Sequence, residues 1–258
     1  MNILDKIVAF KKEEVAARKQ QCPLQQLQQS PAFHRTPYLL SDFLLNPAKT
    51  GIIAEFKRKS PSKGIINDQV SVLEVTQAYT KFGASCLSVL TDSEFFGGST
   101  ADLKAARVNP IPVLRKDFII DEYQITEAKE MGADVILLIA ACLSPGQVQD
   151  LAAYAKSLQL SVLLELHAEE ELQHIGTDTD IVGINNRNLK TFEVDIERSL
   201  RMAAQIPASK IKVAESGISS VENINLFKAN GFKGFLIGEN FMKAANPAQA
   251  FEAFVQQL

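Results

Sequence analysis

The amino-acid sequence predicts a (βα)8 barrel, and three observations support this fold class. The first is the chain's length of 258 residues, 46% of them hydrophobic, which suits one α/β barrel with a full core. The second is a series of eight short, almost continuously apolar runs, as expected for parallel strands buried on both faces. The third is that a segment of helical composition follows each run. We therefore expect a single domain, residues 1–258.

The candidate strands begin at residue 51. They read GIIAEFK (51–57), SCLSVLT (85–91), IPVLRKD (111–117), DVILLIA (134–140), SVLLELH (161–167), IVGINN (181–186), IKVAES (211–216) and GFLIGE (234–239). Helix starts are expected at Asp121-Glu122, Ser144-Pro145, a capping Ser219, and Pro247 in the first turn of the last helix. A doubly wound open sheet is the alternative, but no GxGxxG follows the first run.

Residues 1–48 precede the repeating pattern and are read as an N-terminal extension to a barrel over 49–258. The first stretch is an amphipathic helix, with Ile3, Ile7, Phe10 and Val15 near helical spacing. Because it lies outside the repeat and precedes a strand rich in polar groups, we expect the extension to act as a lid that excludes water.

Composition narrows the functional classes. A formal net charge of −3 argues against binding nucleic acid or an anionic membrane through overall charge. Three distant cysteines give neither a disulfide framework nor a zinc site, and His34, His167 and His174 are not spaced for metal. The charged N-terminus lacks the apolar core of a signal peptide, and no run is long enough to span a bilayer. We expect a cytoplasmic protein without metal or organic cofactor.

Polar residues interrupt or end most of the apolar runs, at the strand ends where this fold places its chemistry. They are Glu55, Lys57, Lys116, Glu165, Asn185, Arg187, Glu215, Ser216 and Gly238. A lone charge at a strand end is most often only where the chain meets water. Glu55 and Glu165, however, have apolar neighbours on both sides, so alternation points them into the barrel, where each needs a cation. Lys57 and Lys116 are placed to supply it, which suits acid–base catalysis.

The run Lys57-Arg58-Lys59, with Lys63 beyond it, has two interpretations. A nucleic-acid patch is one, but the run leaves a buried strand in an acidic protein, so a local anion site is favoured. Gly217 and Gly238 follow the seventh and eighth runs, where barrel enzymes commonly bind phosphate through backbone amides. Together these features indicate a phosphorylated small molecule as the ligand.

Long motifs resemble those of one enzyme family, the indole-3-glycerol phosphate synthases. They are AEFKRKSPSKG (54–64), LTDSEFFGGS (90–99), PVLRKDFIIDEYQI (112–125), LLELHAEEEL (163–172), GINNRNLKTF (183–192) and AESGI (214–218). The resemblance extends from the N-terminal helix to Met242. It implies a cofactor-independent barrel of tryptophan biosynthesis, which converts 1-(2-carboxyphenylamino)-1-deoxyribulose 5-phosphate to indole-3-glycerol phosphate, carbon dioxide and water.

The resemblance also implies roles for individual residues. Lys116 resembles the general acid, Glu165 its acid–base partner and Lys57 a second catalytic lysine. The other expected participants are Glu55, Asn185 and Glu215 as orienting groups, Ser60, Gly217 and Gly238 at the phosphate, Arg187 and Ser216 beside the substrate, and Phe96, Phe118 and Leu189 around the anthranilate ring. Two details differ from the family pattern. Phe56 replaces a smaller aliphatic residue, and Glu239-Asn240-Phe241 follows Gly238. Because of the second difference, we expect backbone contacts to the phosphate after the eighth strand and no reliable side-chain contacts.

Two rival classes share this fold. A phosphate-binding barrel isomerase of the same pathway would need a different acid–base pair and no extension. A barrel that only binds a phosphorylated ligand conflicts with several buried charges, which destabilise a fold that does not use them. We expect a monomer. Association with other enzymes of the tryptophan pathway is left open.

Overall fold

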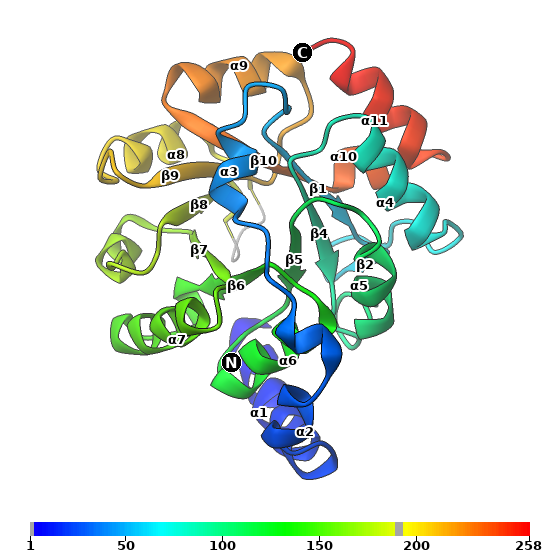
Figure 1. Cartoon of the computed structure of the whole chain (residues 1–258). Helices are drawn as coiled ribbons and strands as arrows, with labels where there is room; N and C mark the ends of the chain where they lie inside the picture. Colours follow the sequence, from blue (N-terminus) through cyan, green and yellow to red (C-terminus); the bar gives the residue numbers. More distant parts are fainter. Residues whose placement is uncertain (1–2, 189–192) are drawn as a thin grey trace.

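Eight parallel strands close into a barrel in the computed structural model, which describes residues 3–188 and 193–258 (Figure 1). The barrel strands are β1 (Ile52–Phe56), β4 (Cys86–Leu90), β5 (Val113–Lys116), β6 (Val135–Ile139), β7 (Ser161–Leu166), β8 (Ile181–Asn185), β9 (Ile211–Glu215) and β10 (Phe232–Ile237). Each lies within one of the predicted runs or extends it by two residues, and β1 closes the ring by pairing with both β4 and β10. The predicted (βα)8 barrel is confirmed.

Helices surround the ring of strands (Figure 1). They are α4 (Val72–Lys81), α5 (Thr100–Ala106), α6 (Glu122–Met131), α7 (Pro145–Ser157), α8 (Ile196–Ala203), α9 (Val221–Ala229), the short α10 (Glu239–Met242) and α11 (Pro247–Val255). The expectation of helical segments after the strands holds with one difference. A 3-10 helix, η3 (Glu169–His174), follows β7 in place of an α-helix. A second 3-10 turn, η2 (Ala140–Cys142), follows β6, and a hairpin of β2 (Lys59–Ser60) and β3 (Gly64–Ile65) follows β1.

Most predicted helix starts are correct. Asp121 caps α6, Ser144 forms a capping box with Gln147 before Pro145, and Pro247 occupies the first turn of α11. The prediction for Ser219 is wrong by one residue. Ser220 is the N-cap of α9, because its side chain accepts the hydrogen bond from the Asn223 amide.

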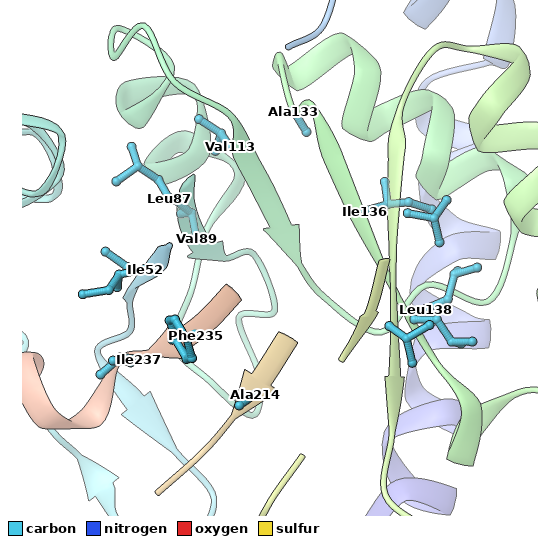
Figure 2. Packing of buried hydrophobic residues seen from close by; sticks show 14 of the residues in the cluster. Ile52, Leu87, Val89, Val113, Ala133, Ile136, Leu138, Ala214, Phe235 and Ile237 are labelled. Atoms are coloured by element: carbon cyan, nitrogen blue, oxygen red, sulfur yellow. The ribbon is translucent and has the colours of Figure 1, made fainter. Parts of the chain in front are cut away.

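Alternation along each strand divides the apolar side chains between two layers. Ile52, Ala54 and Phe56 of β1 belong to the larger cluster, which joins the strands to the helices. Figure 2 shows Ile52 in this cluster beside residues of other strands, such as Leu87 and Phe235. Ile53, between Ile52 and Ala54, belongs to a smaller cluster inside the barrel. Glu55 has the inward parity of Ile53, so period-two geometry directs its carboxyl group toward the barrel axis.

The extension divides between the two ends of the barrel. It comprises α1 (Ile3–Gln21), α2 (Leu24–Gln28), the 3-10 helix η1 (Pro31–His34) and α3 (Leu40–Leu44). In Figure 1 the chain passes from α2, beside α6, to α3, which lies over the opening of the ring of strands. Leu40 and Leu44 are buried in the cluster inside the barrel, and the Leu40 amide donates to Ser161 at the start of β7.

This arrangement corrects the expectation that the whole extension is a lid. The α3 helix closes the amino-terminal end of the barrel, because Ser161 is the first residue of a parallel strand. The α1 helix alone lies at the carboxyl end, where Ile3, Leu4 and Ile7 line the cavity described below. Within residues 3–188 and 193–258, no helix is both long and apolar enough to cross a membrane.

Candidate active site

Four ionisable side chains from alternate strands meet at the carboxyl end of the barrel. Glu55, Lys116, Glu165 and Glu215 belong to the first, third, fifth and seventh barrel strands. In a (βα)8 barrel, side chains from alternate strands fill one layer of the interior. One interior layer, normally apolar, is therefore built here from three carboxyl groups and a lysine.

Lysines pair with two of these carboxyl groups. Lys116 Nζ lies 3.1 Å from Glu165 Oε2, and Lys57 Nζ lies 2.7 Å from Glu55 Oε1. Both lysine side chains are 17% exposed and both carboxylates 4%, so water has access mainly to the ammonium groups. The two predicted acid–lysine pairs are thus formed, and each lysine can transfer a proton toward a molecule in the cavity.

Further polar contacts orient the same carboxylates. Asn185 Nδ2 donates to Glu165 Oε1 at 3.1 Å, and Asn185 Oδ1 accepts the Arg187 amide at 3.0 Å. Ser88 donates to Glu55 Oε2 at 3.4 Å. Because Asn185 is held from both sides, it fixes the carboxylate plane of Glu165.

Glycines on neighbouring strands make room for two of the acids. A Cβ at Gly183 would collide with the Glu215 carboxyl group, and a Cβ at Gly238 would collide with the side chain of Glu55. Gly238 was expected only at the phosphate. Its absent side chain also provides the space for Glu55, and Gly183 has the same function for Glu215.

The surroundings act differently on the ionisable groups of the layer. Burial raises the pKa of Glu215 well above its usual value, and repulsion by Glu165 raises it further. Burial opposes ionisation of Glu165 too, but Lys116, His167 and Asn185 outweigh it and lower the pKa of Glu165 well below its usual value. Burial alone would lower the pKa of Lys116, but Glu165, Glu215 and Glu55 raise it. The surroundings thus favour the charged forms of Glu165 and Lys116 and oppose ionisation of Glu215.

These groups line one cavity of about 370 Å³. Of the predicted site residues, it brings together Glu55, Lys57, Ser60, Phe96, Lys116, Phe118, Glu165, Asn185, Arg187, Glu215, Ser216, Gly217 and Gly238. Leu189, the remaining one, lies outside the described residues. The volume of the cavity is in the range of sites that enclose a small organic molecule.

The cavity has an apolar wall and a polar end. The rings of Phe96 and Phe118 lie 5.9 Å apart between centroids, and Ile7 of α1 lines the same cavity. The polar end contains Ser60, Gly217 and Gly238, together with Ser219 and Lys243, which sequence reasoning missed. Ser216 adopts a left-handed φ of 66°, unusual for a residue with a side chain and typical of strained functional turns.

The basic run after β1 does not converge on a single anion site. Lys57 lines the cavity, but Arg58 forms a bidentate pair with Asp102 of α5 and stacks on the ring of Phe56. Lys59 donates to the Glu94 carbonyl at 3.2 Å. The side chains of the run alternate in direction as it leaves the strand, so Arg58 and Lys59 do not share a site with Lys57, and an anion at Lys57 stays a prediction.

His167 lies beside the layer of acids and was treated as structural by sequence reasoning. Its Nε2 atom lies 2.9 Å from Glu165 Oε1, and its side chain is 7% exposed. The available signal was its position two residues beyond Glu165, which places both on the same face of the chain. Metal spacing was the wrong test for it: among the described residues, no group of three or more His, Cys, Asp or Glu is arranged to hold a metal ion.

The fold and this layer of acids and lysines define a class: a (βα)8-barrel enzyme with an acid–base site at the carboxyl ends of its strands. The family model of indole-3-glycerol phosphate synthase matches residues 4–254. The chain is 47% identical to the indole-3-glycerol phosphate synthase of Bacteroides thetaiotaomicron, across 100% of this chain and 99% of that protein. It is 44% identical to that of Burkholderia ambifaria, across 96% and 97%. The chain belongs to the indole-3-glycerol phosphate synthase family.

Solved structures that are more distant in sequence share the fold. A chain of a tryptophan synthase complex from Pyrococcus furiosus superimposes with a TM-score of 0.58 at 17% identity, covering 81% of this chain and 98% of that one. An N-acetylmannosamine-6-phosphate 2-epimerase from Clostridium perfringens gives a TM-score of 0.60 at 14% identity, covering 87% and 98%. These similarities concern the barrel, and function rests on the family match.

Proposed function

We propose that the cavity performs the family's reaction through the side chains gathered at its base. The chain is an indole-3-glycerol phosphate synthase by family, a carboxy-lyase that acts on a phosphorylated small molecule. Its substrate, 1-(2-carboxyphenylamino)-1-deoxyribulose 5-phosphate, loses carbon dioxide and water to give indole-3-glycerol phosphate. The observation that carries the assignment of roles is the pairing of Lys116 with Glu165 inside the cavity.

Lys116 is the proposed general acid for ring closure. The ring carbon that bears the carboxylate attacks the ketone, and the carbonyl oxygen must gain a proton as the new C–C bond forms. The Lys116 ammonium group stands in the cavity with a carboxylate behind it, so it can stabilise the developing oxyanion and then protonate it. Loss of carbon dioxide then restores the aromatic ring.

Glu165 is the proposed acid–base partner for dehydration. The hydroxyl group formed from the ketone must leave as water, and the neighbouring CH2 carbon must lose a proton as the carbon–carbon double bond of the indole forms, while the nitrogen keeps its hydrogen in the product. Glu165 is held by Asn185 and paired with Lys116, and it can exchange a proton with either the substrate or that lysine. Lys57, oriented by Glu55, is assigned to the carboxylate that departs as carbon dioxide, with Glu215 as a neutral hydrogen-bond donor.

The substrate's two ends match the two ends of the cavity. Its aryl ring fits the wall of Phe96 and Phe118, and we assign Leu189 to the same ring from the resemblance alone. The phosphate belongs at the polar end with Ser60, Gly217 and Gly238, beside Ser216 and Arg187. In this orientation we assign the ketone to the part of the cavity lined by Lys116.

The rest of the proposed setting concerns the whole chain. We assign a single domain that works as a cytoplasmic monomer. The proposed chemistry uses side chains only and needs no cofactor.

Two substitutions of Lys116 test the proposed acid. Lys116→Met keeps the apolar stem but has no proton to give, and removal of a general acid typically lowers kcat by ~10²- to 10⁴-fold. Lys116→Arg keeps the charge, yet its guanidinium holds its proton too tightly to donate it. We expect both variants to fold, to bind substrate within about tenfold of wild type and to be similarly slow. If the arginine variant had near wild-type turnover, Lys116 would act through its positive charge alone and not as a proton donor.

A further inference from the structure

Helix α1 carries a lysine that is entirely withdrawn from solvent. The Lys11 side chain is 0% exposed, and its Nζ lies 2.9 Å from Asp92 Oδ2 and 2.9 Å from Asp117 Oδ1. Both carboxylates are also 0% exposed. We call Lys11, Asp92 and Asp117 the buried ion cluster. Burying an ammonium group is costly, so its presence at a helix contact requires close partners.

The two carboxylates of the cluster hold the loops that carry the aromatic wall. Asp92 Oδ1 accepts hydrogen bonds from the amides of Phe95, at 2.7 Å, and Phe96, at 3.0 Å. Asp117 Oδ1 accepts the Phe118 amide at 2.9 Å. The loops after β4 and β5 therefore each begin with a carboxylate that Lys11 contacts, and one ammonium group joins the backbone of Phe96 to that of Phe118.

The same lysine sets the position of α1 over the cavity. Ile7 lies one helical turn before Lys11 and lines the cavity, as do Ile3 and Leu4 at the start of the helix. Apolar contacts such as that between Phe10 and Phe95, with ring centroids 5.7 Å apart, do not fix a register along a helix by themselves. The ammonium group between Asp92 and Asp117 does, because a small shift leaves the buried Asp92 without its cation, even though Lys11 also pairs with Glu14 of α1 at 2.8 Å and Asp117 also pairs with Arg115 at 3.0 Å.

We propose that Lys11 is a positioning residue for the substrate's aryl ring. It aligns three parts of one apolar wall, namely Ile7 on α1, Phe96 after β4 and Phe118 after β5, without touching the substrate. The proposal rests on the proposed function of this wall, and it assigns Lys11 to substrate binding, with no part in the proton transfers.

The first test compares two buried lysines. Lys129 of α6 is 6% exposed and donates to the Leu158 carbonyl at 2.9 Å, away from the cavity lining, so Lys129→Met is a matched control. We expect Lys11→Met to raise KM about tenfold or more and to keep kcat within about threefold, because the interaction it removes serves binding. Lys129→Met should leave both constants near wild type at a temperature where it remains folded.

A second variant separates positioning from stability. Lys11→Met leaves Asp92 buried without its cation, whereas Lys11→Met/Asp92→Asn removes the pair as a unit and retains an oxygen that can accept the Phe95 and Phe96 amides. The double variant should recover melting temperature relative to the single one and still show the raised KM. Its KM decides the proposal even where the single variant fails to fold.

A third readout needs no substrate. Limited trypsin digestion should cut within residues 3–21 faster in both Lys11 variants than in wild type and Lys129→Met, since α1 is no longer locked. The proposal is overturned by a double variant with wild-type KM and wild-type digestion, or by an equal rise of KM in Lys129→Met. An inactive wild-type protein would instead contradict the proposed function, and the digestion would still report on α1.

Discussion

Glu215 combines complete burial with an unfavourable charge environment. Burial and the neighbouring Glu165 raise its pKa well above the usual value near 4.3. A raised pKa means that the stability contributed by the protonated group is full below the unfolded-state pKa and is lost as pH rises toward the folded-state pKa. The native protein therefore becomes less stable, on account of this residue, as pH rises above about 4.3.

Glu215→Gln should relieve this cost, because glutamine keeps a hydrogen-bond donor toward Glu165 without an ionisation to suppress. We expect a higher melting temperature than wild type at pH 7–8 and a difference that shrinks toward pH 4. A change of about 1 kcal/mol shifts Tm by ~2–4 °C in a chain of this size. Thermal melts of both proteins across this pH range measure it, with the exposed Glu13→Gln as control. A wild-type protein more stable than the variant at pH 8 would contradict the assigned protonation state.

Single residues show how far alternation along a strand leads. The apolar neighbours of Glu55 and Glu165 were enough to predict that both carboxyl groups point into the barrel with lysine partners. Alternation does not reveal that Gly183 must be glycine, because the reason is the carboxyl group of Glu215 on the adjacent strand. Lys11 was equally hidden, because its carboxylate partners are about 80 and 106 residues away in the chain.

Among the elements, the extension has two separable functions, which two truncations distinguish. Removing residues 1–22 deletes α1 and should leave a folded barrel whose KM for the substrate is raised about tenfold or more, because water then reaches the apolar wall. Circular dichroism and steady-state kinetics measure the two effects. Unchanged kinetics in this truncation would show that α1 is not part of the binding site.

Removing residues 1–45 should have a different outcome, since it also deletes α3. Leu40 and Leu44 are 0% and 5% exposed, and burial of one such side chain contributes ~1.5–3 kcal/mol. The pair of them therefore approaches the ~5–15 kcal/mol of a typical domain. We expect this chain to melt at a much lower temperature or to remain unfolded. If the chain without residues 1–45 were as stable as the chain without residues 1–22, α3 would not stabilise the barrel.

The elements also mark where sequence patterns stop being informative. Eight strands were predictable because each is a buried apolar run, and this is a local property. The destination of α3 was not, since a five-residue helix carries no signal for which end of the barrel it closes. The α-helix expected after β7 failed for a related reason: helical composition in HAEEEL does not distinguish an α-helix from the 3-10 turn that forms.

At the scale of the whole molecule, a net charge of −3 does not describe the cavity. Lys57, Lys116, Arg187 and Lys243 line it together with four glutamates, so an anionic substrate meets four cations there although the lining as a whole is not cationic. If phosphate supplies much of the binding energy, the dephosphorylated substrate should lose ~10²-fold or more in kcat/KM, since hydrogen bonds to charged groups contribute ~1.5–3 kcal/mol each. If the natural and the dephosphorylated substrates were turned over equally well, the assignment of the polar end to the phosphate would be wrong.

The ring-closing decarboxylation itself is tested most directly by following both products from the purified chain. Incubation with 1-(2-carboxyphenylamino)-1-deoxyribulose 5-phosphate, without added metal or cofactor, should produce indole-3-glycerol phosphate and carbon dioxide in equal molar amounts. The indole product is measured by its fluorescence. Lys116→Met should produce neither at a comparable rate. Conversion of the substrate to an isomer with its carboxylate retained, or binding without conversion, would contradict the account.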